Sequence, residues 1–121
     1  MKCPCNPNKK YKDCCEKAHK NILSVDTSEE LMRSRYSAFV LANINYLQLS
    51  HHSSTRPSNK EKKEILNWTK AIQWIKLEVL NSTINTVEFK AYFIENGVID
   101  IIHENSLFNK ENNHWVYLKS K

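Results

Sequence analysis

The chain of 121 residues is poor in residues that break regular structure, and it has no long hydrophobic run. It contains one glycine and three prolines, so no stretch has the composition of a linker or a low-complexity segment. No apolar run approaches the ~20 residues that a transmembrane helix needs. No apolar region follows Lys2 either, which argues against a secretory signal. We therefore expect one cytoplasmic globular domain in which thiols stay reduced.

Cysteine is absent from the 106 residues that follow Cys15, and all four cysteines lie in CPCNPNKKYKDCC, residues 3–15. Four soft thiolate ligands are what a closed tetrahedral zinc site requires, and iron accepts the same ligands. A redox pair or disulfide between the adjacent Cys14 and Cys15 is the alternative, which a reducing compartment disfavours. The spacing predicts a metal site formed by Cys3, Cys5, Cys14 and Cys15, with zinc expected and iron as the other possible ion.

Acidic residues are scarce around these cysteines. Residues 1–20 contain six lysines and two acidic residues, whereas the rest of the chain carries twelve basic and eleven acidic side chains. Four thiolates around Zn²⁺ carry a net negative charge, which nearby lysines offset. The same lysines predict attraction to an acidic partner. The candidate partner-binding residues are Lys9, Lys10, Tyr11 and Lys12, with the Tyr11 ring either stacked on a nucleic-acid base or packed against the metal loop.

The hydrophobic pattern changes period halfway along the chain, from helical spacing to alternation. A helix is predicted over 26–43, where Thr27 and Glu30 fit a capping box. Asn43 and Asn45 are expected to end it and to cap a short second helix that carries Tyr46 to Leu49. A third helix is predicted over 59–72, after a loop over 50–58. Strands are predicted over 74–80, 86–93, 98–108 and 114–119. Asn96-Gly97 is typical of a tight hairpin turn. This order predicts an α+β domain with helices packed on one face of a curved antiparallel sheet.

Two sets of motifs resemble known families. CPCNPNKKYKDCC resembles the SEC-C motif, a small zinc-binding module found at the C-terminus of the SecA translocation ATPase and in many other bacterial proteins. The rest of the chain is similar to the YchJ-type family in LMRSRYSAFV (31–40), NYL (45–47), WIKLEVL (74–80) and IHENSLFNKENNHWVYL (102–118). The resemblance implies a SEC-C-like segment over 1–20 and a nuclear transport factor 2-like domain, a cone of helices over a curved sheet, over 21–121.

The SEC-C-like segment departs from its family at one place. The usual Gly-Ser-Gly after the second cysteine is replaced by Asn6-Pro7-Asn8. Because asparagine tolerates a left-handed backbone better than most residues do, we expect Asn6 and Asn8 to replace the two glycines in a turn. Residues Lys9 to Asp13 are then expected to form one helical turn that presents Cys14 and Cys15.

A cone of this kind leaves a cavity at its open end, for which His52, Arg33 and Glu104 are the polar candidates. Structural roles are favoured for them, such as an ion pair between a helix arginine and Glu104. Arg33 and Arg35 lie about 200° apart on a helix, so only one of them can face inward. No nucleophile with an obvious base, glycine-rich phosphate loop or short carboxylate pair is present. Two other histidines are expected on the surface, His51 and His114.

Two functions follow from these patterns. The first is a zinc-binding adaptor whose lysine-rich segment contacts an acidic protein or a ribosome, since the resembling module of SecA contacts the chaperone SecB and the ribosome. Contact with RNA through these lysines is expected to be non-specific and salt-sensitive. The second is a small-molecule-binding or enzymatic cone that uses a pocket around His52 as candidate base. The missing catalytic motifs favour the adaptor.

Overall fold

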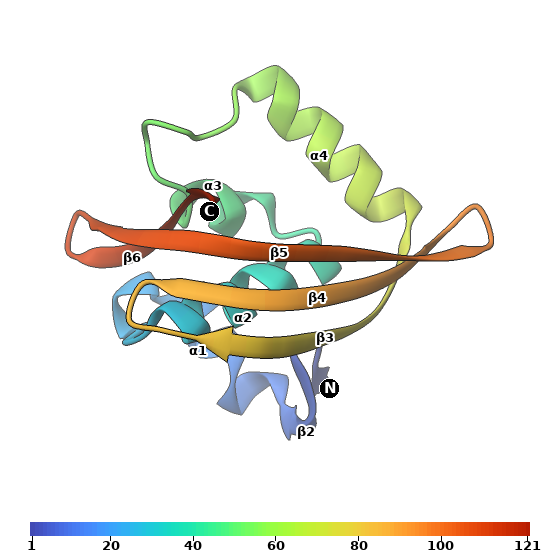
Figure 1. Cartoon of the computed structure of the whole chain (residues 1–121), viewed down its shortest axis with the longest axis horizontal. Helices are drawn as coiled ribbons and strands as arrows, with labels where there is room; N and C mark the ends of the chain where they lie inside the picture. Colours follow the sequence, from blue (N-terminus) through green and yellow to red (C-terminus); the bar gives the residue numbers. More distant parts are fainter.

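Four antiparallel strands form the main sheet of the computed structural model, which describes residues 1–121. The strands follow one another in the sheet in chain order: β3 (Gln73–Ser82), β4 (Thr86–Glu95), β5 (Val98–Glu111) and β6 (His114–Ser120). A separate small hairpin near the N-terminus consists of β1 (Lys2–Cys3) and β2 (Asn6–Lys10). Figure 1 shows this hairpin at the opposite end of the molecule from helix α4.

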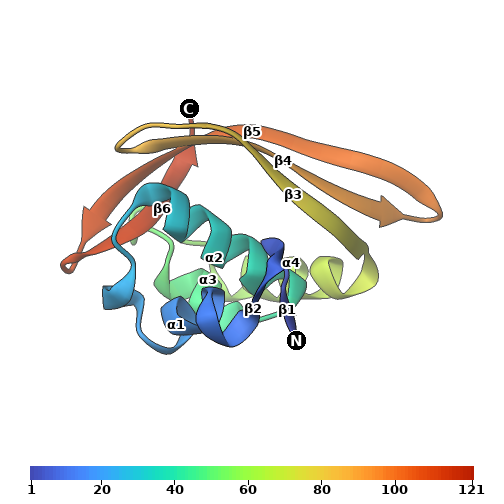
Figure 2. The ribbon, with the colours of Figure 1, turned by 90° about the horizontal axis from the view of Figure 1, so that it is seen from below.

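The helices lie together on the concave side of the curved main sheet (Figure 2). They are α1 (Cys15–Lys20), α2 (Ser28–Val40), α3 (Ile44–Leu49) and α4 (Asn59–Ala71), with short 3₁₀ turns η1 (Tyr11–Asp13) and η2 (Ile22–Ser24). The predicted α+β architecture of helices on a curved antiparallel sheet is confirmed. The longest helices have 13 residues, and none has both the length and the apolar character needed to cross a membrane.

Local capping residues explain where the helices begin. The Thr27 side chain accepts a hydrogen bond from the Glu30 amide, as predicted. In a capping box the Glu30 carboxylate would accept from the Thr27 amide. Here it accepts from the Asp26 amide instead, so the predicted capping box is only half formed. Asn43 caps α3 as predicted. Helix α2 ends before the predicted residue 43 because Ala42 has a φ of 55°, which a helix cannot continue through.

Asparagine-containing turns connect the long strands. Asn96 and Gly97 have φ values of 52° and 78°, the left-handed pair that a tight hairpin turn requires, as predicted. Asn112 and Asn113 make a second turn with φ values of 55° and 68°. Strand β5 therefore runs on to Glu111, beyond the predicted end at residue 108.

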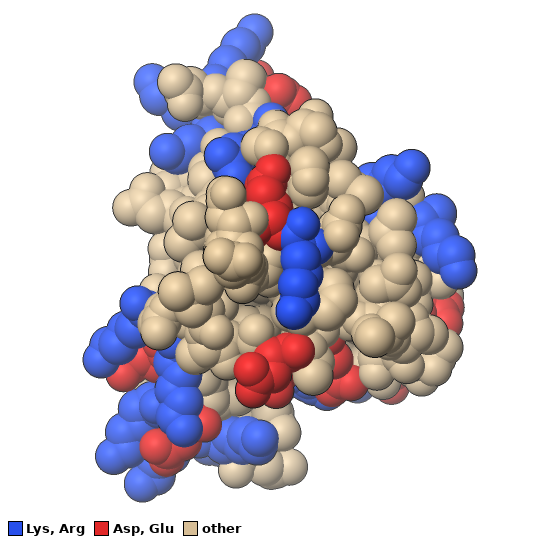
Figure 3. Space-filling model, turned by 90° about the vertical axis from the view of Figure 1, so that its left-hand side faces the viewer, with Lys and Arg blue, Asp and Glu red and all other residues tan.

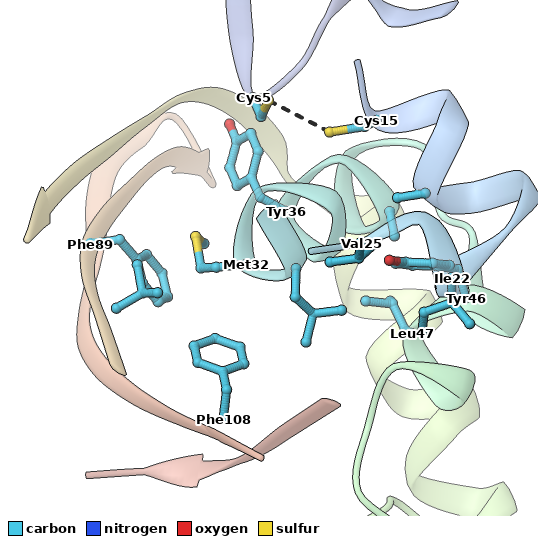
Figure 4. Packing of buried hydrophobic residues seen from close by; sticks show 14 of the residues in the cluster. Cys5, Cys15, Ile22, Val25, Met32, Tyr36, Tyr46, Leu47, Phe89 and Phe108 are labelled. Carbon is cyan, nitrogen blue, oxygen red and sulfur yellow. Dashed lines mark hydrogen bonds between the residues drawn. The ribbon is translucent and has the colours of Figure 1, made fainter. Parts of the chain in front are cut away.

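One hydrophobic core connects the main sheet, helix α2 and the N-terminal residues. Figure 4 shows Phe89 and Phe108 projecting from the sheet toward Met32 of α2, with Cys5 and Cys15 beyond Tyr36. Buried cysteines thus belong to the same cluster as the residues of the sheet. The N-terminal segment is packed against the body, and the division at residue 20 remains a prediction.

The expected surface positions of two histidines are wrong. His114 is buried, with 7% of its surface exposed, because it opens β6 on the inward-facing side. His51 is partly buried and packs edge-on against the Tyr117 ring, with 5.0 Å between ring centroids. Both histidines follow polar or loop-like sequence, which hid their contacts with distant parts of the chain.

Replacing the fully buried Leu31 is expected to destabilise the whole fold. Leu31 has 0% exposure at the end of the first turn of α2, so Leu31→Ala should lower the free energy of unfolding by roughly 2–5 kcal/mol in urea titrations. Leu23→Ala is the matched control, since Leu23 is 61% exposed and should cost less than about 0.5 kcal/mol. Equal losses from the two variants would contradict this description of the core.

Candidate metal centre

The first two cysteines lie at the bend of the N-terminal hairpin. Cys3 ends β1 and Cys5 stands in the turn just before β2. The prediction for the asparagines is wrong: neither Asn6 nor Asn8 has a positive φ, and both belong to β2. The turn lies at Pro4–Cys5, before the predicted Asn6-Pro7-Asn8. Neither residue of this turn has a positive φ. The Asn6 side chain instead accepts a hydrogen bond from the Asn8 amide at 3.0 Å.

The second pair of cysteines, Cys14 and Cys15, lies where the 3₁₀ turn η1 ends and helix α1 begins. The 3₁₀ turn η1 covers Tyr11–Asp13, within the segment where one helical turn was predicted. Cys14 then has an irregular backbone, with φ −134° and ψ −111°, and Cys15 opens α1. This break between two short helices turns both side chains toward the hairpin, as the distances between sulfurs show.

The four Sγ atoms lie within 4.8 Å of one another. Cys5 is central, with its sulfur 3.7 Å from Cys3, 3.6 Å from Cys14 and 3.5 Å from Cys15; Figure 4 shows the contact with Cys15. A tetrahedron with metal–sulfur bonds of about 2.3 Å has sulfur–sulfur edges of about 3.8 Å. A disulfide requires about 2.05 Å, and all four cysteines are free. The four cysteines therefore fit a tetrahedral metal centre and could hold a metal ion.

The electrostatics of the thiols favour a cation among them. The hydrogen bond from Cys15 is the main cause that lowers the pKa of Cys5 to about 5. Burial, and then the neighbouring thiols, raise the pKa of Cys14 to about 12, and the pKa of Cys15 is raised as well. One thiolate therefore forms readily, while further negative charges beside it are costly. A divalent cation removes that cost by binding all the thiolates.

Helix α2 supports the cysteines from behind. The Arg33 guanidinium donates to the Cys5 carbonyl at 3.2 Å and to the Glu29 carboxylate at 3.0 Å. Ser37, one turn further along α2, has its hydroxyl 3.7 Å from the Cys3 sulfur. Arg33, a candidate for the cavity, thus faces the cysteines and does not line the cavity.

A chain of hydrogen bonds joins the metal segment to the core. The His19 Nε2 donates to the Ser34 carbonyl at 2.8 Å, so its Nδ1 accepts from the Tyr11 hydroxyl at 2.6 Å. The Ser34 hydroxyl in turn lies 2.7 Å from that of Tyr46, and burial lowers the pKa of His19. The sequence interpretation missed His19, although its position four residues after Cys15 places it one helical turn from a ligand.

The six lysines of residues 1–20 are all exposed. Only Lys20 is paired with a carboxylate, that of Glu16 at 3.1 Å. Figure 3 shows lysine and arginine side chains gathered at the lower end of the molecule, where Figure 1 places this segment. Of the two placements considered for Tyr11, the structure shows packing, since its ring lies against His19 with centroids 5.6 Å apart.

The candidates for the cavity are divided by the structure. A cavity of about 270 Å³ lies between the main sheet and helices α2, α3 and α4, and Glu104 lines it. His52, expected there, is not among its lining residues; its neighbour His51 is. The reason is a short parallel pairing of His51 with Tyr117, which extends the backbone so that consecutive side chains point to opposite sides. His52 lies 3.6 Å from the Glu111 carboxylate instead.

The expected ion pair between a helix arginine and Glu104 is also wrong. Glu104 accepts hydrogen bonds from the Ser106 hydroxyl at 2.8 Å and the Tyr117 hydroxyl at 3.2 Å. Neither Arg33 nor Arg35 has a nitrogen within ion-pair distance of it. Hydroxyl donors close to Glu104 on its own sheet satisfy the carboxylate without an arginine.

Comparison with known proteins decides the family. Residues 27–120 match the model described as "YchJ, middle NTF2-like domain", which covers most of the chain. The chain belongs to the YchJ family. A UPF0225 protein of Vibrio parahaemolyticus is 41% identical over 122 residues, covering 96% of this chain and 72% of the relative.

Two solved structures extend the YchJ assignment to the cysteine segment. A SEC-C motif containing protein from Psychrobacter arcticus has a TM-score of 0.80 and 34% identity, covering 98% of this chain and 81% of the other. Another from Rhodopseudomonas palustris has a TM-score of 0.82 and 28% identity, covering 100% of this chain and 98% of the other. The predicted combination of a SEC-C motif with a YchJ-type domain is confirmed.

Cobalt provides a direct test of the four-sulfur centre. Adding Co²⁺ to metal-free protein should produce the absorption bands of a tetrahedral tetrathiolate, because all four sulfurs already lie near the required spacing. Cys5→Ser should weaken Co²⁺ binding by at least about tenfold and change the bands. Asn8→Ser, in the same hairpin but with an exposed side chain, is the control. Equal binding by Cys5→Ser would exclude Cys5 as a ligand.

Chelation is expected to loosen the N-terminal segment selectively. Residues 1–20 contain few buried side chains other than the cysteines, so metal removal should speed their amide hydrogen exchange by about tenfold or more. Amides of the paired strands β4 and β5 should stay protected. Unchanged exchange in residues 1–20 would show that the segment is ordered without an ion.

Proposed function

We propose that this protein is a zinc-binding adaptor whose N-terminal segment contacts an acidic protein or ribosomal surface. The observation that carries the proposal is the set of exposed lysines without ion-pair partners on the segment that the cysteines fold. They are Lys2, Lys9, Lys10, Lys12 and Lys17. Since the rest of the chain is nearly neutral, this segment is where an acidic partner is most attracted.

Zinc is the proposed ion because the site is closed and built for structure. Four thiolates fill all positions of a tetrahedral site and leave none open for a substrate. Three of the four cysteines are buried, with 2% exposure for Cys3, 3% for Cys5 and 4% for Cys15. Closed tetrathiolate sites of this kind are typical of structural zinc. The ion then orders the backbone that carries the lysines, so metal binding and partner binding are linked.

Three of these lysines lie between the two pairs of cysteines. Lys9 and Lys10 end β2, and Lys12 lies in η1, before Cys14. All three are exposed, while the Tyr11 hydroxyl between them is held by His19. The tyrosine therefore fixes the loop, and the three lysines supply the contact. Recognition by such a surface depends on charge and geometry and has little dependence on nucleotide sequence.

Charge reversal of the three lysines tests the adaptor. The native protein should sediment with purified bacterial ribosomes in low salt. Its affinity should fall roughly 20- to 40-fold between about 50 and 200 mM salt if three phosphates are contacted. The triple variant Lys9→Glu, Lys10→Glu and Lys12→Glu should lose this binding. An acidic protein partner should be recovered from lysate by the native chain and lost with the same variant.

The matched control uses a second group of lysines on α4. Lys60, Lys62 and Lys63 lie at the other end of the molecule (Figure 1). Replacing all three by glutamate changes the net charge by the same amount as the N-terminal triple variant does. The α4 triple variant should retain binding. Recovery of the same partners by the native chain and the N-terminal triple variant would contradict the proposal, and equal loss from both triple variants would reduce it to an effect of net charge.

A further inference from the structure

The cavity of the cone is hydrophobic over most of its wall. Of its 19 lining residues, 13 are hydrophobic, and several of the lining side chains are aromatic. Trp68 and Trp74 meet edge to face, with 5.6 Å between ring centroids. Figure 4 shows Phe89 and Phe108 directed from the sheet toward α2 along the same space. Since an apolar cavity of about 150 Å³ holds a benzene-sized molecule, 270 Å³ accepts a ring with a short chain.

One arginine brings a positive charge to this hydrophobic wall. The Nη1 of Arg35 donates to the Leu47 carbonyl at 2.8 Å and to the Ser50 hydroxyl at 2.7 Å. Its Cζ stands 5.1 Å from the centroid of the Tyr117 ring. These contacts hold the guanidinium plane in place. The Nε and Nη2 groups donate to no protein acceptor, and neither is enclosed without solvent access.

No carboxylate neutralises Arg35 at close range. No acidic oxygen lies within 4.0 Å of its nitrogens, and both oxygens of Glu104 are engaged by hydroxyl donors. Burial lowers the pKa of Arg35 only to about 10, so the group stays charged at neutral pH. A charge in an apolar site is costly unless it is paired. The free edge of Arg35 is therefore the strongest attraction for an anion in the cavity.

The neighbouring residue His51 does not add a second positive charge to the cavity. Burial, followed by the charge of Arg35, lowers the pKa of His51 to about 4, so its ring is neutral. A backbone hydrogen bond with Thr55 engages one of its ring nitrogens and acts in the opposite direction. His51 thus offers one neutral donor or acceptor beside Arg35, suited to a second polar atom of a ligand.

We propose that this cavity binds a small carboxylic acid with an aromatic or aliphatic body. The carboxylate pairs with the Nε and Nη2 edge of Arg35, and the body lies among Trp68, Trp74 and Phe89. The planar guanidinium fork matches a carboxylate in a bidentate arrangement. The inference assigns a binding site to the cone and does not depend on the adaptor function of residues 1–20.

The comparison of acids with their amides tests the charge without changing the protein. The probes are benzoate, 3-phenylpropionate, 5-phenylpentanoate and hexanoate, each with its primary amide, added to the ¹⁵N-labelled, metal-loaded full chain. At least one acid should shift amide resonances of the cavity wall and bind about tenfold or more tightly than its amide, because charge-assisted hydrogen bonds are the stronger ones. The shifts should not be centred on Lys9, Lys10 and Lys12.

Several results would overturn the proposal. They are equal affinity of every acid and its amide, no binding of any acid below about 1 mM, and shifts confined to the N-terminal lysines. Tighter binding of 3-phenylpropylamine than of 3-phenylpropionate would do so too, since it would identify Glu104 as the anchor. The acid–amide comparison uses the native chain, so it decides even where a variant fails to fold.

Variants of Arg35 separate the fork from its charge. Arg35→Gln should abolish the preference for the acid, and Arg35→Lys should keep a weakened preference because it retains charge without the bidentate geometry. Lys70→Gln removes one exposed positive charge from α4 and should leave binding unchanged. Acid binding by Arg35→Gln equal to that of the native chain would exclude Arg35 as the anchor.

Discussion

The convergence of four thiols on one point determines how the first twenty residues are arranged. The sulfurs lie within 4.8 Å of one another, and in that setting the pKa of Cys5 is lowered while those of Cys14 and Cys15 are raised. Bringing several thiolates together is unfavourable unless a cation lies among them. The hairpin, the 3₁₀ turn and the start of α1 all place a cysteine at this point, so their geometry depends on what binds there.

Helix α2 is the shared wall between the metal segment and the cone. Arg33 points to the Cys5 carbonyl, and Arg35, two residues later, points to the cavity. Their opposite directions follow from helical geometry, in which two residues span about 200°. The same helix carries Leu31 at 0% exposure into the common core. One helix, buried on several of its sides, thereby anchors two sites that face away from each other.

Features set by nearby residues could be predicted from the sequence. The order of helices and strands from residue 26 onward, the cap at Asn43 and the turn at Asn96-Gly97 were all predicted, because spacing and turn chemistry act over a few residues. The strands β1 and β2 and the helix α1 were not predicted. The nearness of the four cysteines could likewise be inferred from their types and positions. A structural role for Tyr11 was one of the alternatives considered.

Features set by contacts across the chain could not be predicted. His51 faces the cavity and His52 does not, because His51 pairs with Tyr117 in the last strand. No local sequence pattern reveals this pairing. Glu104 was expected to need an arginine, yet Ser106 and Tyr117 satisfy it. The turn was predicted at Asn6-Pro7-Asn8 because these residue types are common in turns, whereas the pairing of β1 with β2 places the bend at Pro4–Cys5.

The order of the strands also bears on how the molecule acquires its shape. Each strand of the main sheet pairs with the strand that follows it in the chain, and the turns between them are short. Closing each short turn costs little chain entropy before the hydrogen bonds and contacts of the paired strands form. Such low contact order is associated with rapid folding. The main sheet can therefore form one hairpin at a time in the C-terminal half of the chain, because no strand has to pair with one that is distant in the sequence.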